Sequence, residues 1–118
     1  MSEVLLRNRR GSRTGCSTIS ISRRGFAFNK LFLQENSITE KNVYVSVIPE
    51  ECIVKFRFSK VATEDTYRLG FFSKGGAHIC LPYVFTEHPW VSESEKKRFV
   101  PTRREDEKGV FYIIRIGE

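Results

Sequence analysis

Short alternations of apolar and polar residues are the feature that most constrains the fold of this chain. Such runs cover 19–22, 43–47, 52–59 and 66–72, and a β-branched and aromatic run covers 109–116. A period of two residues is typical of strands with one face against a core. Segment 29–35 fits either a strand or a short helix, and 92–98 fits a short helix. The sequence therefore predicts a mainly β fold of the α+β class, a twisted antiparallel sheet with one or two short helices.

The chain is long enough for one domain. Its 118 residues, divided between two cores, would leave each half with fewer than ~60 residues, which is marginal for independent folding. Residues 1–17 differ from the rest because arginine, serine, glycine and asparagine dominate them. We therefore expect a flexible basic arm over 1–17 and a single β-rich domain over 18–118.

The cysteines and the apolar runs bear on the compartment. No apolar run approaches the ~18 residues that a membrane span needs, and residues 1–18 contain no apolar stretch typical of a secretory signal. Cys16, Cys52 and Cys80 are odd in number and widely spaced, which favours reduced thiols over a disulfide framework. These features predict a soluble cytoplasmic protein (in the host cytoplasm if a phage encodes it) without a membrane partner.

Positive charge is concentrated in two parts of the chain. The excess of 20 Lys+Arg over 14 Asp+Glu gives a formal net charge of +6, and basic clusters occur within residues 1–24 and within 96–104. Clustered cations favour a polyanion as partner. A solvated surface with a flexible tail would account for the same charges, so both interpretations stay open at this point.

Strand alternation assigns many of the remaining cations to one face. In three of the predicted strands, cations and aromatic rings occupy the positions that alternate with apolar ones. Alternate side chains lie on opposite faces of a strand. If these strands are neighbours, one face of the sheet is apolar core, and the other face carries Tyr44, Lys55, Arg57, Arg68 and Phe72.

Cations interleaved with aromatic rings suit single-stranded nucleic acid. Positive charge follows the phosphates, and each exposed ring that stacks on an unpaired base contributes ~1–3 kcal/mol. Bases in a duplex are already stacked and would not use such a surface. The plain alternative is that the rings pack under a loop or at a dimer interface while the cations solvate the outer face of an ordinary antiparallel sheet.

Other chemistries have weaker support in the sequence. The glycine-rich run 73–76 lacks the spacing of a phosphate-binding loop and predicts a hairpin turn. His78 and Cys80 could form only one close pair of zinc ligands, whereas structural zinc sites use two. No nucleophile elbow or acid–base pattern is present. We therefore predict no enzymatic activity, metal, cofactor or small-molecule substrate.

The order of the parts carries a first resemblance. A Ser/Arg-rich arm and a series of strands precede KGGAHICLP at 74–82, which leads to a segment containing Trp90. This order resembles the single-stranded-DNA-binding domain of the eukaryotic transcription coactivator positive cofactor four and its bacterial and phage relatives. The resemblance implies a homodimer whose curved sheets bind DNA strands through basic and aromatic side chains.

A second resemblance rests on the first half of the chain. The run ISISRRGFAFNK at 19–30, followed by Ser37-Ile38 and the alternation at 43–47, is similar to the swapped-hairpin regulators of the AbrB type. That resemblance implies a dimer that binds duplex DNA through basic residues near the turn.

Both resemblances imply a β-rich DNA-binding homodimer, and the aromatic and basic pattern favours single strands. We therefore predict a non-enzymatic protein that binds single-stranded DNA, or RNA, in replication, recombination or transcription. The alternatives are a duplex-binding regulator and a protein-interaction or inhibitory module that binds no nucleic acid. The residues expected to bind phosphate are Arg23, Arg24, Lys30, Lys55, Arg57, Arg68 and Lys74, and those expected to stack on bases are Phe26, Tyr44 and Phe72.

Overall fold

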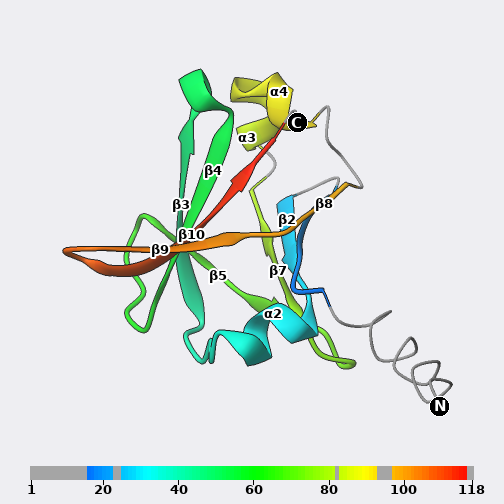
Figure 1. Ribbon diagram of the computed structural model, residues 1–118, viewed down its shortest axis with the longest axis vertical. Helices are drawn as coiled ribbons and strands as arrows, with labels where there is room; N and C mark the ends of the chain where they lie inside the picture. The colour runs from blue at the N-terminus through cyan, green and yellow to red at the C-terminus, as the bar shows by residue number, and fades with distance from the viewer. Residues whose placement is uncertain (1–15, 23–24, 82, 93–96, 117–118) are drawn as a thin grey trace, which may run out of the picture.

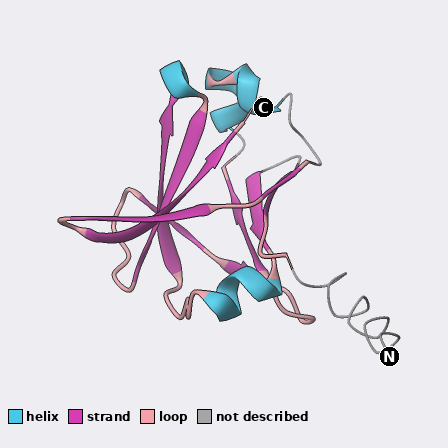
Figure 2. Ribbon diagram, viewed as in Figure 1, coloured by secondary structure: helices cyan, strands magenta, loops and turns pink. Residues whose placement is uncertain are grey.

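Two five-stranded antiparallel sheets make up most of the structure. The computed structural model describes residues 16–22, 25–81, 83–92 and 97–116, and its strands form two separate groups (Figures 1 and 2). The predicted mainly β fold with short helices is confirmed, although the strands divide between two sheets. The arm predicted over 1–17 lies almost entirely outside the described residues, and the homodimer stays a prediction.

The first sheet, sheet A, is built around the hairpin at the start of the described chain. Gly25 of this hairpin lies so close to the neighbouring strand that an added Cβ would overlap the carbonyl oxygen of Ile79, which explains why glycine is needed there. The strand order of sheet A is β6 (Gly70–Phe71), β7 (Ala77–Cys80), β2 (Gly25–Phe28), β1 (Ile19–Ser22) and β8 (Arg98–Phe99).

The second sheet, sheet B, contains the longest strands. Its central strands β3 and β4 pair over their whole lengths, from Asn42 opposite Ser59 to Ile48 opposite Ile53. Beyond them, the β9–β10 hairpin crosses in front of β3 and β4 and extends away from sheet A (Figure 1). The strand order of sheet B is β5 (Thr66–Arg68), β3 (Asn42–Ile48), β4 (Ile53–Ser59), β10 (Gly109–Arg115) and β9 (Thr102–Asp106).

The chain passes directly from one sheet to the other at two places. The single strand predicted over 66–72 is instead broken at Leu69, where the chain leaves β5 of sheet B and enters β6 of sheet A. The backbone N–H of Leu69 donates to the carbonyl of Lys41 at 2.9 Å, and its side chain is buried in the core. A second crossing joins β8 to β9 through Val100 and Pro101. Such strand bends are how two packed sheets share their corners.

An aromatic cluster fills the space between the sheets. The Phe56 ring of β4 meets those of Phe26 and Phe28 from β2 edge to face, with ring centroids 5.1 and 5.3 Å apart. Phe28 also packs against Phe58 and, at 5.7 Å, against Phe32. Aromatic pairs of this kind stabilise a core beyond the area that they bury.

Short helices lie at both ends of the sheets (Figure 2). At one end, Asn29 caps the helix by accepting hydrogen bonds from the backbone N–H groups of Phe32 at 2.8 Å and Thr18 at 3.1 Å; this cap decides segment 29–35 in favour of a helix. At the other end, Val91 is buried in the core. None of the described helices has the length and apolarity needed to cross a membrane. The helical segments are α2 (Lys30–Glu35), η1 (Pro49–Glu51), α3 (Tyr83–Glu87) and α4 (Pro89–Ser92).

The aromatic cluster gives a direct test of the core. We expect Phe56→Ala to lower the free energy of unfolding by about 3–5 kcal/mol, because it removes a fully buried ring that touches both sheets. Urea denaturation followed by circular dichroism would measure the loss. Phe71→Ala is the control: its side chain is 55% exposed, so the change should stay within about 0.5 kcal/mol. Similar losses for both variants would contradict this assignment of the core.

Candidate nucleic-acid interface

The outer face of sheet B, turned away from sheet A, gathers the cations and rings of several strands. The register places Tyr44 opposite Arg57, and Ser46 opposite Lys55, while the alternating valines of β3 face inward. On the other side of β4, Ile113 lies opposite Lys55 and Phe111 opposite Arg104. We call this surface the basic face; its cations and rings are Arg68, Tyr44, Lys55, Arg57, Phe111, Arg115 and Arg104.

Phe111 lies at the centre of the charged part of the basic face. The Nζ atom of Lys55 is 4.3 Å from its ring centroid, and the guanidinium carbon of Arg57 is 5.1 Å away. Both distances are within the range of cation–π attraction. The sequence pattern does not identify Phe111 as a site residue, because the alternation in 109–116 defines two faces but does not say which strand lies beside it.

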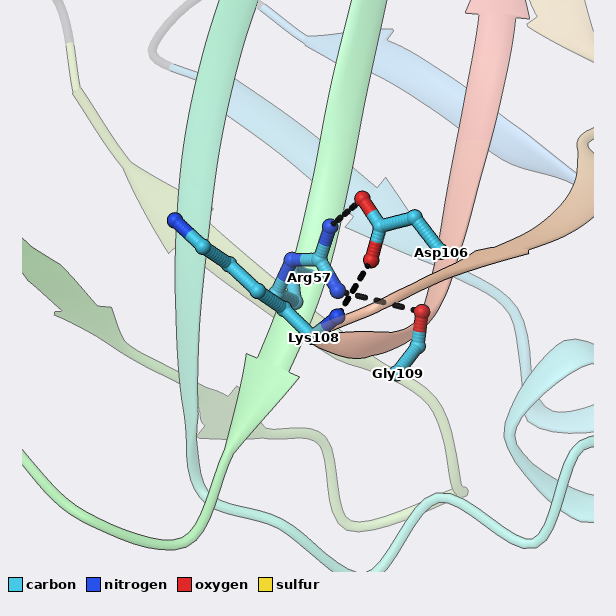
Figure 3. Close-up of polar contacts among 4 residues, drawn as sticks. All are labelled: Arg57, Asp106, Lys108 and Gly109. Carbon is cyan, nitrogen blue, oxygen red and sulfur yellow. Dashed lines mark hydrogen bonds and ion pairs between the residues drawn. The ribbon is translucent and has the colours of Figure 1, made fainter.

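Arg57 is held by the turn of the β9–β10 hairpin (Figure 3). Its Nη2 donates to the Asp106 carboxylate at 2.6 Å, and its Nη1 donates to the Gly109 carbonyl at 3.1 Å. The other carboxylate oxygen of Asp106 accepts from the Lys108 backbone N–H at 2.9 Å. One carboxylate therefore accepts hydrogen bonds both from the hairpin turn and from the guanidinium, while the Gly109 carbonyl makes a second, separate contact with Arg57.

Gly109 makes this turn possible. Its φ of +115° is a conformation that side-chain-bearing residues rarely adopt, although nothing lies within 4 Å of the place where a Cβ would be. The requirement for glycine is thus conformational and not steric, as is common just after a hairpin turn. The turn in its normal geometry directs the Gly109 carbonyl toward Arg57.

A hollow of ≈ 1070 Å³ opens beside this contact. Tyr44 and Lys55 of the basic face contribute to its lining, together with the 36–40 turn and the β9–β10 hairpin. Tyr112 also lines it from the inner side of β10, and burial raises the pKa of its phenol, an effect that the nearby Arg103 partly opposes. The lining of the hollow combines aromatic and aliphatic side chains with charged side chains of both signs.

Three other predicted residues form a separate group at sheet A. Phe72 is exposed in the turn between β6 and β7, and its ring centroid is 4.8 Å from that of His78. Lys74 belongs to the same turn, and the side chain of Lys30 lies against Gly75. Phe72 is therefore not on the basic face, because the chain crosses to sheet A at Leu69 before reaching it. Segment 73–76 is a hairpin turn, as predicted.

The remaining predicted residues do not join the basic face. The prediction that Phe26 stacks on bases is wrong: its side chain is 0% exposed, and it packs between the sheets against Phe56. β2 pairs with β1 on one side and β7 on the other, and its aromatic face is turned toward sheet B. Arg23 and Arg24 lie outside the described residues. The basic face thus keeps Tyr44, Lys55, Arg57 and Arg68 from the sequence prediction.

Comparisons with known proteins add no relative. No family model, no curated protein and no solved structure matches the chain. The resemblances to positive cofactor four and to the AbrB-type regulators therefore stay predictions. Within the described residues, no group of three or more His, Cys, Asp or Glu is placed to bind a metal ion.

The contact between Arg57 and Asp106 predicts a titration. Hydrogen bonding from Arg57 holds the pKa of the Asp106 carboxyl below its usual value of 3.8, with smaller help from the Lys108 backbone N–H. Since the pKa is lower in the folded state, the ion pair adds stability at pH values above 3.8 and loses it as the pH falls. We expect Arg57→Gln to raise the pKa of Asp106 in an NMR titration of its side-chain carboxyl carbon.

Arg103→Gln is the matched control for that titration. Arg103 is on the same strand as Asp106 but lies on the other face, opposite Tyr112. Its loss should therefore leave the pKa of Asp106 unchanged. If removing Arg57 has no larger effect than removing Arg103, then Arg57 does not hold this carboxylate in solution.

Proposed function

We propose that this chain binds single-stranded nucleic acid, DNA in the first place, along the basic face. The observation that carries the proposal is the interleaving of Tyr44 and Phe111 with cations of β4, β5, β9 and β10 on one solvent-facing sheet surface. Binding would involve no reaction and no cofactor. The process served (replication, recombination or transcription) belongs to the same proposal.

The cations supply the sequence-independent part of the binding. Cations on several neighbouring strands of one sheet face form a positively charged surface that can follow the phosphate backbone of an extended strand. Each phosphate that a lysine or arginine neutralises releases condensed counterions, which makes the affinity fall as salt rises. Lys55, Arg57, Arg68 and Arg104 are the residues that this role fits.

The aromatic rings favour unpaired bases over a duplex. Tyr44 is half-buried, and its hydroxyl accepts a hydrogen bond from Thr63 at 3.3 Å, which restrains the ring. Phe111 is also half-buried, and the cations over its ring are the groups that phosphates attract. When the flexible Lys55 side chain turns to a phosphate, the part of the ring that it covers becomes available to a base. A duplex already stacks its bases and gains nothing from such rings.

Fluorescence anisotropy tests the proposal directly. The full chain is titrated into a labelled oligomer of about 20 nucleotides, single-stranded and then duplex, at about 50 and 200 mM salt. We expect tighter binding to the single strand, and a loss of affinity with salt in both cases. Preference for the duplex would instead support a duplex-binding regulator. No binding to either would leave the alternative of a protein-interaction module.

Phe111→Ala separates stacking from charge. We expect it to weaken single-strand binding by about 1–3 kcal/mol while leaving the salt dependence unchanged, because the ring contacts bases and not phosphates. The same anisotropy titration measures both quantities. Tyr83→Ala, which removes a different exposed ring, on α3, should leave the affinity unchanged. Equal losses for the two variants would argue against the basic face as the stacking surface.

A further inference from the structure

We propose that Asp106 acts as an internal substitute for phosphate: in the free protein its carboxylate occupies the place on Arg57 that a phosphate of the bound strand takes. The inference rests on the proposed function and assigns a phosphate subsite within the basic face. The subsite consists of the Arg57 guanidinium, which the Gly109 carbonyl holds in place. The side chain of Asp106 is the group that the phosphate displaces from it.

The geometry of the contact supports this role. A carboxylate oxygen 2.6 Å from Nη2 is at the distance of a charge-assisted hydrogen bond, and phosphate oxygens bind guanidinium groups in the same way. Nη1 of Arg57 donates to the Gly109 carbonyl, which orients the guanidinium independently of the carboxylate. Arg57 therefore stays in position when Asp106 turns away.

The contact is also weak enough to be displaced. The Asp106 side chain is 40% exposed, and that of Arg57 is 17% exposed, so the carboxylate is the partner that water reaches more easily. Ion pairs at a solvent-exposed site add little to stability. A nucleic-acid strand brings several phosphates at once, and those held by Lys55 or Arg104 would place another beside Arg57 at high effective concentration.

This arrangement would make binding selective for chains of phosphates. A single small anion would have to compete with the carboxylate alone, without help from neighbouring cations. A strand that occupies the whole basic face repels Asp106 with several charges and displaces it. Asp106 would thus lower the affinity of the basic face for isolated anions more than its affinity for polyanions.

The conservative variant Asp106→Asn tests the substitution. The Asn side-chain oxygen can still accept from the Lys108 N–H, so the turn is kept while the charge is removed; the melting temperature checks this. Glu105→Gln is the matched control, since Glu105 is the adjacent residue on β9, lies opposite Val110 and points to the other face. Both variants are titrated against the labelled single strand and against sodium polyphosphate, with wild-type protein alongside.

We expect Asp106→Asn to bind both polyanions about threefold more tightly than wild type, and Glu105→Gln to change the affinity little. The gain should disappear when Arg57→Gln is also present, because the carboxylate and the phosphate then have no guanidinium to compete for. Equal gains from Asp106→Asn and Glu105→Gln, a gain that persists without Arg57, or weaker binding by Asp106→Asn would each overturn the inference.

The two ligands separate failure of this inference from failure of the proposed function. If wild-type protein binds polyphosphate but not the oligonucleotide, the proposed function is wrong, and the polyphosphate titrations still decide the role of Asp106. If wild type binds the oligonucleotide and Asp106→Asn binds it with the same affinity, the proposed function stands, and the inferred role of Asp106 as a substitute for phosphate is wrong. If neither ligand binds, both are overturned.

Discussion

Contact between phenylalanine rings across the two sheets is the interaction on which the rest of the structure depends. Phe56 of β4 lies against Phe26 and Phe28 of β2. The inner faces of both sheets are therefore buried in the core. Once β4 turns Phe56 inward, the alternation of the strand leaves Lys55 and Arg57 on the opposite side. The position of the cations is therefore a consequence of where the rings pack, and any partner of the cations must approach from outside sheet B.

Local alternation was enough to predict the faces of β3 and β4, because each strand carries that information in its own sequence. It placed Tyr44 and Arg57 on one side, and the register of the two strands agrees. The same reasoning failed for Phe26, because the run Gly25–Phe28 contains no polar residue that would mark one of its two faces as exposed. It also failed for Phe72, because the chain crosses from sheet B to sheet A at Leu69 before it reaches this residue. Phe111 was missed because its neighbours are set by a pairing between distant segments.

The β9–β10 hairpin brings opposing elements to one place on the basic face. Phe111 and Arg104 add a ring and a positive charge that a nucleic-acid strand would contact. Asp106, in contrast, is paired with Arg57, which the strand would need for a phosphate. Phe111, Arg104 and Asp106 all belong to the two strands that this hairpin turn joins. The same turn also supplies both groups that contact Arg57, the Gly109 carbonyl and the Asp106 carboxylate. In the proposed function, the hairpin therefore determines both how strongly the surface attracts an anion and which anions can displace its own carboxylate.

The two places where the chain crosses between sheets have a mechanical consequence. A strand that begins in one sheet and continues in the other cannot leave its first partners without pulling on its second ones. Because such crossings occur on either side of the molecule, at Leu69 and at Val100–Pro101, opening sheet B also strains sheet A. The two sheets should therefore melt as one cooperative unit. A force applied to the exposed β9–β10 hairpin would be distributed over both sheets and would not detach β9 and β10 alone.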